Sequence, residues 1–485
     1  MASLSILARD LAQIVGERHV REARAERLTY SMDGLPTHRR VPDLVVLPGS
    51  REELIAVVRL LAALEVPFVP RGAGTGLSGG ALAAEGSVLL VLTRLNRVLQ
   101  IDTANRRAVV EPGVVNAKLG AAAKPHGLQY APDPSSQSAC TIGGNVAENA
   151  GGPHCLKYGV TANHILALEI LLADGSLVEI GSPGGEPWGP DLVGLFVGSE
   201  GNFGIATRIT ARLTPMPRAI RTLLADFNAL RIAGEAVSAI IASGIVPAAL
   251  EMMDQSCIRA VEDSVYAAGY PRDAAAVLLV EIDGRITDAV VAETDVVTEL
   301  LRKSGARSVR SAASEAERER LWQGRKKAFG AMGRLSRDLV VQDAVVPRSA
   351  LPHVLETIST IASHYGLVVS NVFHAGDGNL HPNISFDATD PALKQRVEAA
   401  SAEIMQVCID AGGTITGEHG VGIDKLRYMP LIFDAESLGA MQAVRRVFDP
   451  EERANPGKVV PVHACREWIS ANPGASPRGQ PRAVA

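Results

Sequence analysis

The chain has 485 residues, of which 47% are hydrophobic and 21% charged, and its formal net charge is −5. This length predicts two or three domains, and the apolar content is that of a globular protein. The charge balance, without any block of like charges, gives nucleic-acid binding no electrostatic basis.

The cysteine content and the hydropathy of the chain indicate the cellular compartment in which it is expected. The five cysteines are widely spaced, with no CxxC pair, so neither a zinc ribbon nor a disulfide framework is expected. This favours a reducing, cytoplasmic location. We find no pattern typical of a signal peptide, and the most apolar helical stretch, residues 54–64, is too short for a transmembrane segment. Peripheral contact with the inner membrane through a partner stays open.

In chain order, residues 3–28 predict a helix with charges on one face, within an N-terminal helical segment 1–40. A short strand is expected at 44–47. Ser50 and Glu53 then form a capping-box signature for a helix through residue 64. A strand at 67–70 leads into a glycine-rich loop.

The remaining elements predict an α+β fold. Short strands recur between residues 88 and 214, which favours two small α+β subdomains rather than regular βαβ units. The second half mixes strands and helices and predicts a cap domain with an antiparallel sheet. The expected division is a first domain with the glycine-rich loop at 41–217, the cap at 218–424, a C-terminal helical segment packing back on the first domain at 425–463, and a disordered tail at 464–485.

The loop at residues 71–80 matches a dinucleotide fingerprint in form, through Gly74, Gly76 and Gly79. That fingerprint should open a long helix, but only residues 81–85 precede Gly86 and a new strand, so a Rossmann fold is not expected. Bare backbone N–H groups in such a loop can still bind a pyrophosphate. The alternative is a plain flexible loop.

Two further clusters of small residues, at 132–152 and 198–205, favour a long ligand held between backbones. These segments resemble the FAD-binding domain of the vanillyl-alcohol-oxidase-type flavoproteins. The resemblance implies FAD contacts from Arg71, Gly72, Ala73, Gly74, Thr75, Gly76, Leu77, Ser78, Gly79, Gly80, Pro134, Ser135, Thr141, Gly143, Gly144, Asn145, Asn149, Gly151, Glu200, Gly204, Ile205 and Asn455. The first loop has no histidine, so FAD is expected to be non-covalent.

The sequence between residues 367 and 422 carries a histidine pair. A two-residue hairpin turn centred on Asp377 and Gly378 would put His374 opposite His381, with Asn383 on the same face. Glu418 offers a carboxylate, and two histidines with one carboxylate are typical of a catalytic metal site. The alternative is that the histidines only form hydrogen bonds within the turn.

Two segments resemble the FAD-linked 2-hydroxy-acid dehydrogenase family, which includes glycolate- and D-lactate-oxidising members. They are the His-Ala-Gly-Asp-Gly-Asn-Leu-His-Pro segment at 374–382 and the Gly-Glu-His-Gly-Val-Gly loop at 417–422. The resemblance implies that His374, His381 and Glu418 bind a divalent metal, Zn, Mn or Fe, and that His419 is the catalytic base. It assigns Arg325 to the substrate carboxylate. Asn383 is a further candidate for substrate binding.

The implied reaction is oxidation of a small (D)-2-hydroxy acid to the 2-oxo acid, with metal-assisted deprotonation and hydride transfer to flavin N5. The segment 339–343 lacks the lysine of the D-2-hydroxyglutarate enzymes, which favours glycolate or D-lactate. The alternatives are a D-2-hydroxyglutarate dehydrogenase, an electron-transfer subunit of a multi-subunit oxidase, and a non-redox flavoenzyme such as an ether-lipid synthase. Without iron–sulfur cysteine spacing, electrons must pass to an iron–sulfur partner subunit, a quinone or a soluble acceptor, and an oligomer or complex is expected.

Overall fold

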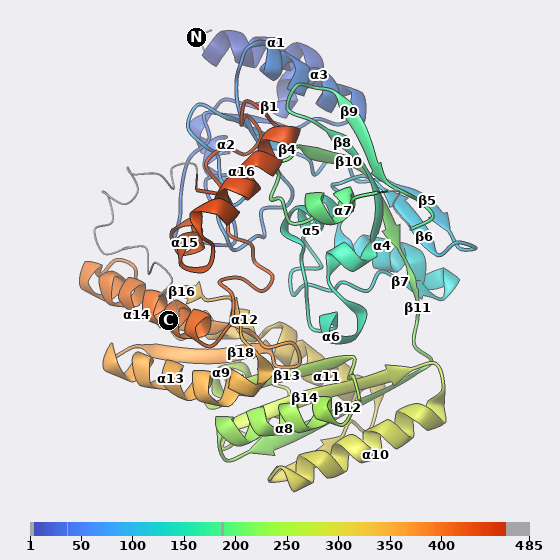
Figure 1. Cartoon of the computed structure of the whole chain (residues 1–485), viewed down its shortest axis with the longest axis vertical. Helices are drawn as coiled ribbons and strands as arrows, with labels where there is room; N and C mark the ends of the chain where they lie inside the picture. Colours follow the sequence, from blue (N-terminus) through green and yellow to red (C-terminus); the bar gives the residue numbers. More distant parts are fainter. Residues whose placement is uncertain (1–3, 36, 186–188, 462–485) are drawn as a thin grey trace, which may run out of the picture.

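The computed structural model describes the chain except for residues 1–3, 36, 186–188 and 462–485. Figure 1 shows two bodies, one built from the N-terminal half and the other from the middle of the chain. The expected tail at 464–485 lies outside the described residues. The α+β fold class is confirmed by the mixture of helices with mostly antiparallel sheets.

The first sheet orders its strands β1-β2-β4-β3, with the last three parallel. Apolar side chains of α1 and α3 cover it. Ser50 caps α3 by accepting a hydrogen bond from Glu53 N at 3.1 Å, as the capping signature predicts. The elements are α1 (Leu4–Val15), β1 (Val20–Arg21), α2 (Arg24–Leu28), β2 (Leu44–Val46), α3 (Arg51–Ala63), β3 (Phe68–Arg71) and β4 (Val88–Val91).

The single helix expected over residues 3–28 is wrong. α1 ends at Val15 because Gly16 adopts a φ of +84°, a left-handed conformation that cannot continue a right-handed helix. A short 3-10 turn, β1 and α2 follow. The charges that favoured one long helix are solvent-facing in each of these short elements, so they carried no information on where the helix ends.

The second sheet is antiparallel, in the order β5-β6-β10-β8-β9, with a separate β7–β11 pair. It packs against α4, α5 and α7 through one apolar cluster. The elements are β5 (Val98–Asp102), β6 (Arg107–Val110), α4 (Asn116–Ala123), β7 (Leu128–Gln129), α5 (Ile142–Glu148), α6 (Cys155–Tyr158), β8 (Ile165–Leu171), β9 (Leu177–Gly181), α7 (Leu192–Phe196), β10 (Ile205–Arg212) and β11 (Thr214–Pro215).

The third sheet forms the cap, with the order β15-β12-β14-β13-β18-β19-β17 and the pair β16–β20 beside β18. Helices cover both faces. The elements are β12 (Ala219–Phe227), α8 (Leu230–Ala242), β13 (Ala249–Asp254), α9 (Gln255–Glu262), β14 (Ala276–Gly284), α10 (Thr287–Lys303), β15 (Ser308–Ser311), α11 (Glu315–Lys326), α12 (Ala328–Met332), β16 (Asp338–Val341), β17 (Ala344–Val345), α13 (Leu351–His364), β18 (Val368–His374), β19 (Asn379–Leu380), β20 (Pro382–Phe386) and α14 (Pro391–Asp410).

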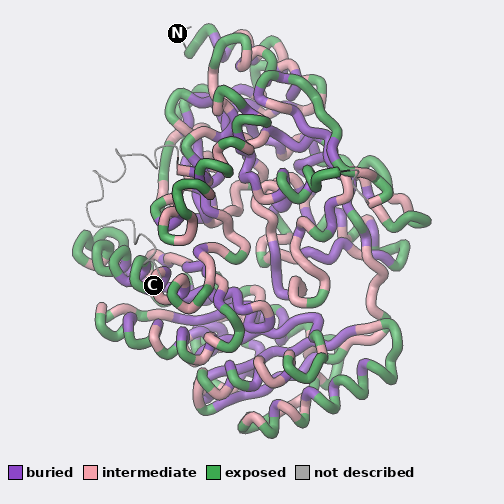
Figure 2. Tube along the Cα trace, viewed as in Figure 1, coloured by how far each residue is buried: buried purple, intermediate pink, exposed green. Residues whose placement is uncertain are grey.

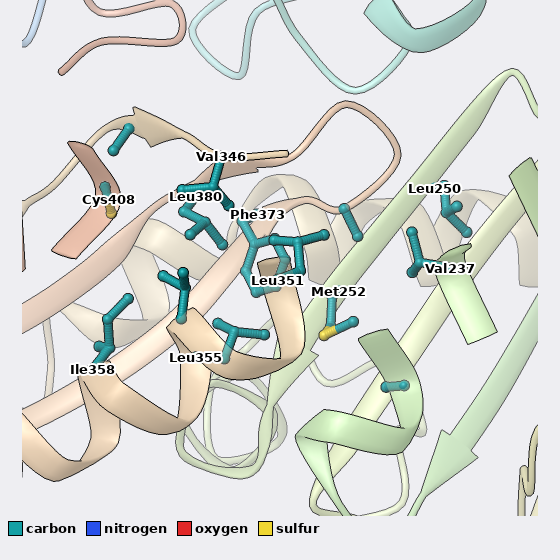
Figure 3. Close-up of a cluster of buried hydrophobic side chains, with 14 of the residues drawn as sticks. Val237, Leu250, Met252, Val346, Leu351, Leu355, Ile358, Phe373, Leu380 and Cys408 are labelled. Carbon is teal, nitrogen blue, oxygen red and sulfur yellow. The ribbon is translucent and has the colours of Figure 1, made fainter. Parts of the chain in front are cut away.

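Alternate residues of the cap strands face opposite layers, as strand geometry requires. Leu250, Met252 and Phe373 point into the apolar cluster under α8 and α13, which Figure 3 shows in close-up. Met253 and Val372 face the other side, toward α9, α11 and α12. Figure 2 shows the same layering, with buried strands inside and exposed outer faces on the helices.

The last helices of the described chain, α15 (Met429–Ile432) and α16 (Ala435–Phe448), lie beside the first body, in orange-red in Figure 1. Phe68 of β3 donates its N–H to Arg453 O and accepts from Asn455 N. Sheet membership changes between β11 and β12, whereas the domain boundaries expected at residues 217 and 424 stay predictions.

Candidate active site

A cavity of about 740 Å³ lies between the glycine-rich segments and the α11–α12 face of the cap sheet. Both sets of residues singled out from the sequence meet in its walls, although they are far apart in the chain. The expected cofactor residues that line it are Arg71, Gly72, Ala73, Gly74, Thr75, Gly76, Leu77, Gly80, Pro134, Ser135, Thr141, Gly143, Gly144, Asn145, Gly151, Glu200, Gly204 and Ile205.

The glycine loop begins where β3 ends and is held from both sides. The Arg71 guanidinium donates to Met32 O at 2.8 Å and to Ala81 O at 3.2 Å, which joins the start of the loop to its end. At Gly72 a Cβ atom would lie 2.4 Å from Thr141 Oγ1, so only glycine allows this approach to α5. Such a wall of bare backbone suits an extended, phosphate-bearing cofactor such as FAD.

Four expected cofactor residues lie outside the lining, namely Ser78, Gly79, Asn149 and Asn455. Ser78 O accepts from Ile423 N, and Gly79 packs on Ile423. Asn149 ends α5 with a φ of +50°, and its side chain accepts from Ala162 N. Asn455 donates to Gly80 O and Glu200 O. These four residues support the cavity walls from outside the lining.

The candidate metal ligands converge in the cavity. The Nε2 atoms of His374 and His381 each lie 3.2 Å from Glu418 Oε1, and the three ligand atoms lie within 4.8 Å of one another. All three residues are largely buried, and His381 Nε2 makes no hydrogen bond. An orphaned buried imidazole nitrogen beside a carboxylate is a donor set that fits a divalent metal.

The strand register differs from the one expected. His374 pairs with Asn379 of β19, not with His381, because the connection at 375–378 is four residues long rather than two. Gly378 takes a φ of +81° there. His381 follows β19 and precedes β20, and its ring centroid still lies 5.4 Å from that of His374. The two imidazoles therefore meet although the predicted pairing was wrong.

Asp343, between β16 and β17, holds the loop that carries Glu418 and His419. Its carboxylate is fully buried, accepts the backbone N–H groups of Glu418 and His419, and pairs with Lys425 Nζ at 2.8 Å. The ligand atoms of Asp343, His381 and His419 also cluster within 4.8 Å. Because the Asp343 oxygens are already engaged by these donors, the His374–His381–Glu418 group has the freer ligand atoms.

His419 lies beside the ligand set, with its ring stacked on His381 at 4.9 Å and its Nε2 3.9 Å from Glu418 Oε1. Burial lowers the pKa of His419 to about 4, so its imidazole is neutral at pH 7. Burial opposes the charge on Glu418, but His374 and His381 outweigh it and hold the pKa of this carboxyl well below its usual range. Glu418 is therefore an anion.

The two candidate substrate residues also line the cavity. Arg325, at the end of α11, is 4% exposed and pairs with Glu251, while its Nε is buried without a hydrogen bond. Asn383 on β20 donates to His381 O at 2.6 Å, and its Oδ1 has no partner. Each therefore keeps a polar atom free for a ligand.

The sequence interpretation missed Glu251 and Asp343, two buried acids that contact the site residues. Each is an acidic residue within a largely apolar stretch, which is the local signal that could have drawn attention to them. Glu148, a further acid in the cavity wall, was also missed. Burial and the neighbouring Glu200 raise its pKa well above the usual range.

Comparisons with known proteins show the family to which this chain belongs. The sequence model described as "FAD linked oxidases, C-terminal domain" matches residues 216–459, and the one described as "FAD binding domain" matches residues 42–181. The chain therefore belongs to the FAD-linked oxidases and is an FAD-linked oxidoreductase. The expected family, class of enzyme and FAD cofactor are confirmed.

Among its relatives, the chain is 49% identical over 444 residues to glycolate oxidase subunit GlcD of Escherichia coli strain K12, covering 91% of this chain and 89% of the relative. It is 40% identical to the GlcD subunit of Bacillus subtilis strain 168 (95% and 98% covered) and 32% identical to a D-lactate dehydrogenase of Anaerostipes hadrus (86% and 89% covered).

Solved structures agree on the fold. A p-cresol methylhydroxylase with substrate bound superposes with a TM-score of 0.79 at 17% identity, covering 94% of this chain and 97% of that one. An alkyldihydroxyacetonephosphate synthase gives 0.75 at 18% identity, covering 94% and 86%. Among the described residues, none of the helices is long and apolar enough to cross a membrane.

Proposed function

We propose that this protein oxidises a small 2-hydroxy acid, glycolate or D-lactate, to the corresponding 2-oxo acid. The observation that carries the proposal is the convergence of His374 and His381 on Glu418 inside the cavity lined by the glycine loops. The relatives named glycolate oxidase subunit and D-lactate dehydrogenase support the substrate class.

His374, His381 and Glu418 would hold a divalent metal, Zn, Mn or Fe. When bound, the metal supplies a Lewis acid that lowers the pKa of the substrate hydroxyl. FAD would bind non-covalently, because the loop at 71–80 has no histidine. When bound, FAD supplies the two-electron acceptor. The chain's own residues then have to bind the acid, orient its C2–H bond and take the hydroxyl proton.

Arg325 would bind the substrate carboxylate through its unpaired Nε, and Asn383, whose Oδ1 has no partner, is a further candidate for contact with the substrate. His419 would accept the hydroxyl proton as a general base. The C2 hydrogen leaves with its electron pair as the C2–O bond becomes a carbonyl, so the substrate loses one proton and one hydride. The segment 339–343 has no lysine, and its Val341 adds apolar surface to the cavity, which favours an acid without a second carboxylate.

The electrons must then leave the protein. The four cysteines that the structure describes are free, and three of them are buried. They offer no cluster site, so an iron–sulfur partner subunit, a quinone or a soluble acceptor would receive the electrons in a complex. An electron-transfer subunit without its own substrate is the weaker reading, because all three histidines of the site are present.

The test is anaerobic mixing of the FAD-loaded protein with glycolate, D-lactate, L-lactate or D-2-hydroxyglutarate while the visible flavin absorbance is recorded. We expect bleaching by a short acid, and its loss in His419→Ala and after removal of divalent metal with a chelator. His353→Ala, which removes an exposed histidine of α13, is the matched control and should bleach normally. Bleaching by D-2-hydroxyglutarate alone would refute the short-acid assignment, and no bleaching by any acid would refute the reaction.

A further inference from the structure

Glu251 is a charged residue in the middle of a buried strand. Its side chain is 0% exposed, and it lies in β13 opposite His374 of β18. Its neighbours on the same face of the strand are the apolar Ala249 and Met253. A lone carboxylate in such a place would cost several kcal/mol, so its partners must compensate for the lost hydration.

The first partner of Glu251 is a candidate metal ligand. Glu251 Oε1 lies 2.8 Å from His374 Nδ1, within hydrogen-bond distance. A neutral imidazole carries one N–H, and a carboxylate at Nδ1 keeps that hydrogen on Nδ1. In the neutral imidazole that a metal would bind, the lone pair is then on Nε2, the atom that lies 3.2 Å from Glu418 Oε1. Glu251 thus fixes both the orientation and the tautomer that a metal-binding imidazole needs.

The second partner of Glu251 is the candidate substrate residue. Glu251 Oε2 pairs with Arg325 Nη2, and the Arg325 side chain is 5% exposed. Without this carboxylate the guanidinium would be an uncompensated buried charge. Arg325 lines the cavity, with its Nη2 engaged by Glu251 and its Nε free. The ion pair therefore also sets which edge of the guanidinium faces a ligand.

We propose that Glu251 is a positioning residue that orients the metal ligand His374 with one carboxylate oxygen and the substrate-binding Arg325 with the other. It acts through these two side chains and does not line the cavity itself. The proposal rests on the function proposed above, because it assumes that His374 binds the metal and that Arg325 binds the substrate carboxylate. Glu251 would align both side chains.

The test compares Glu251→Gln with the wild type for divalent-metal affinity, measured by chelator competition on the FAD-loaded protein. An amide at this position can donate to His374 Nδ1 and so favour the tautomer with hydrogen on Nε2, which cannot bind a metal. We expect metal affinity to fall about 10- to 100-fold. The KM for the hydroxy acid should also rise, because Arg325 loses its carboxylate partner.

Asp254→Asn is the matched control. Asp254 is a buried acid of the same strand, and its carboxylate accepts from Asn371 and from Cys257 N rather than from site residues. Metal affinity and KM should be those of the wild type in this variant, even where its stability is lower. This separates positioning from a general effect of removing a buried charge in β13.

A double variant, Glu251→Gln with Arg325→Met, guards against misfolding, because it removes both members of the buried pair and leaves no lone guanidinium. The loss of metal affinity should persist in it, since His374 still lacks its carboxylate. Wild-type metal affinity in Glu251→Gln, or recovered affinity in the double variant, would overturn the proposal. A wild-type protein that binds no divalent metal would overturn the metal site, and the role of Glu251 with it.

Discussion

His154 links the two bodies of the molecule through a pair of acids, and its removal should change how stability depends on pH. His154 Nδ1 lies 2.9 Å from Asp133 Oδ2, next to the cavity-lining Pro134, and Nε2 lies 3.2 Å from Glu281 Oε1 in the cap sheet. Burial opposes the charged imidazole, but the two acids outweigh it and raise the pKa of His154 to about 10.

The sign and size of the effect follow from proton linkage. With a folded pKa above the unfolded value of about 6.5, the stabilisation is complete below that value and is lost as pH rises through about 10. In this window the folded protein binds up to one more proton than the unfolded chain. Each pH unit is then worth at most about 1.4 kcal/mol, so raising the pH from 7 to 9 should cost about 2–3 kcal/mol.

The assay is urea unfolding at pH 7 and pH 9 of the wild type, His154→Gln and the control His353→Gln, all in the same cofactor and metal state. We expect the wild type and the control to lose about 2 kcal/mol more stability over this range than His154→Gln, which is less stable at pH 7. Other titrating groups cancel in the comparison. Equal pH dependence in His154→Gln and the wild type would refute the reasoning.

Two further substitutions test the site scaffold and the core. Asp343→Asn leaves Lys425 buried without its carboxylate and weakens the hold on the 417–422 loop, so we expect a loss of about 3–5 kcal/mol in urea unfolding together with weaker metal binding by chelator competition. Unchanged stability would contradict this. Phe373→Ala opens a cavity in the apolar cluster of Figure 3 and should cost about 3–5 kcal/mol by chemical denaturation, with a loss below 1 kcal/mol contradicting the packing.

The sequence by itself determined the class of this protein and most of its candidate site residues. The glycine spacing predicted that residues 71–80 present bare backbone to a ligand. In the structure this segment approaches α5 closely, because Gly72 has no Cβ atom that would collide with Thr141. The Ser50 cap was readable because a cap depends on residues only three positions apart. The resemblance that singled out His374, His381 and Glu418 likewise rests on short motifs.

Only the tertiary structure decided what depends on contacts between distant segments. The end of α1 at Val15 depended on the backbone conformation of Gly16, which periodicity does not report. The partner of His374 in the sheet, and the buried acids Glu251 and Asp343 behind the site, depended on which strands and loops pack together. The role of an acidic residue in an apolar segment becomes evident only when folding brings a histidine, an arginine or a lysine to its carboxylate, because an unpaired buried charge is too costly to persist.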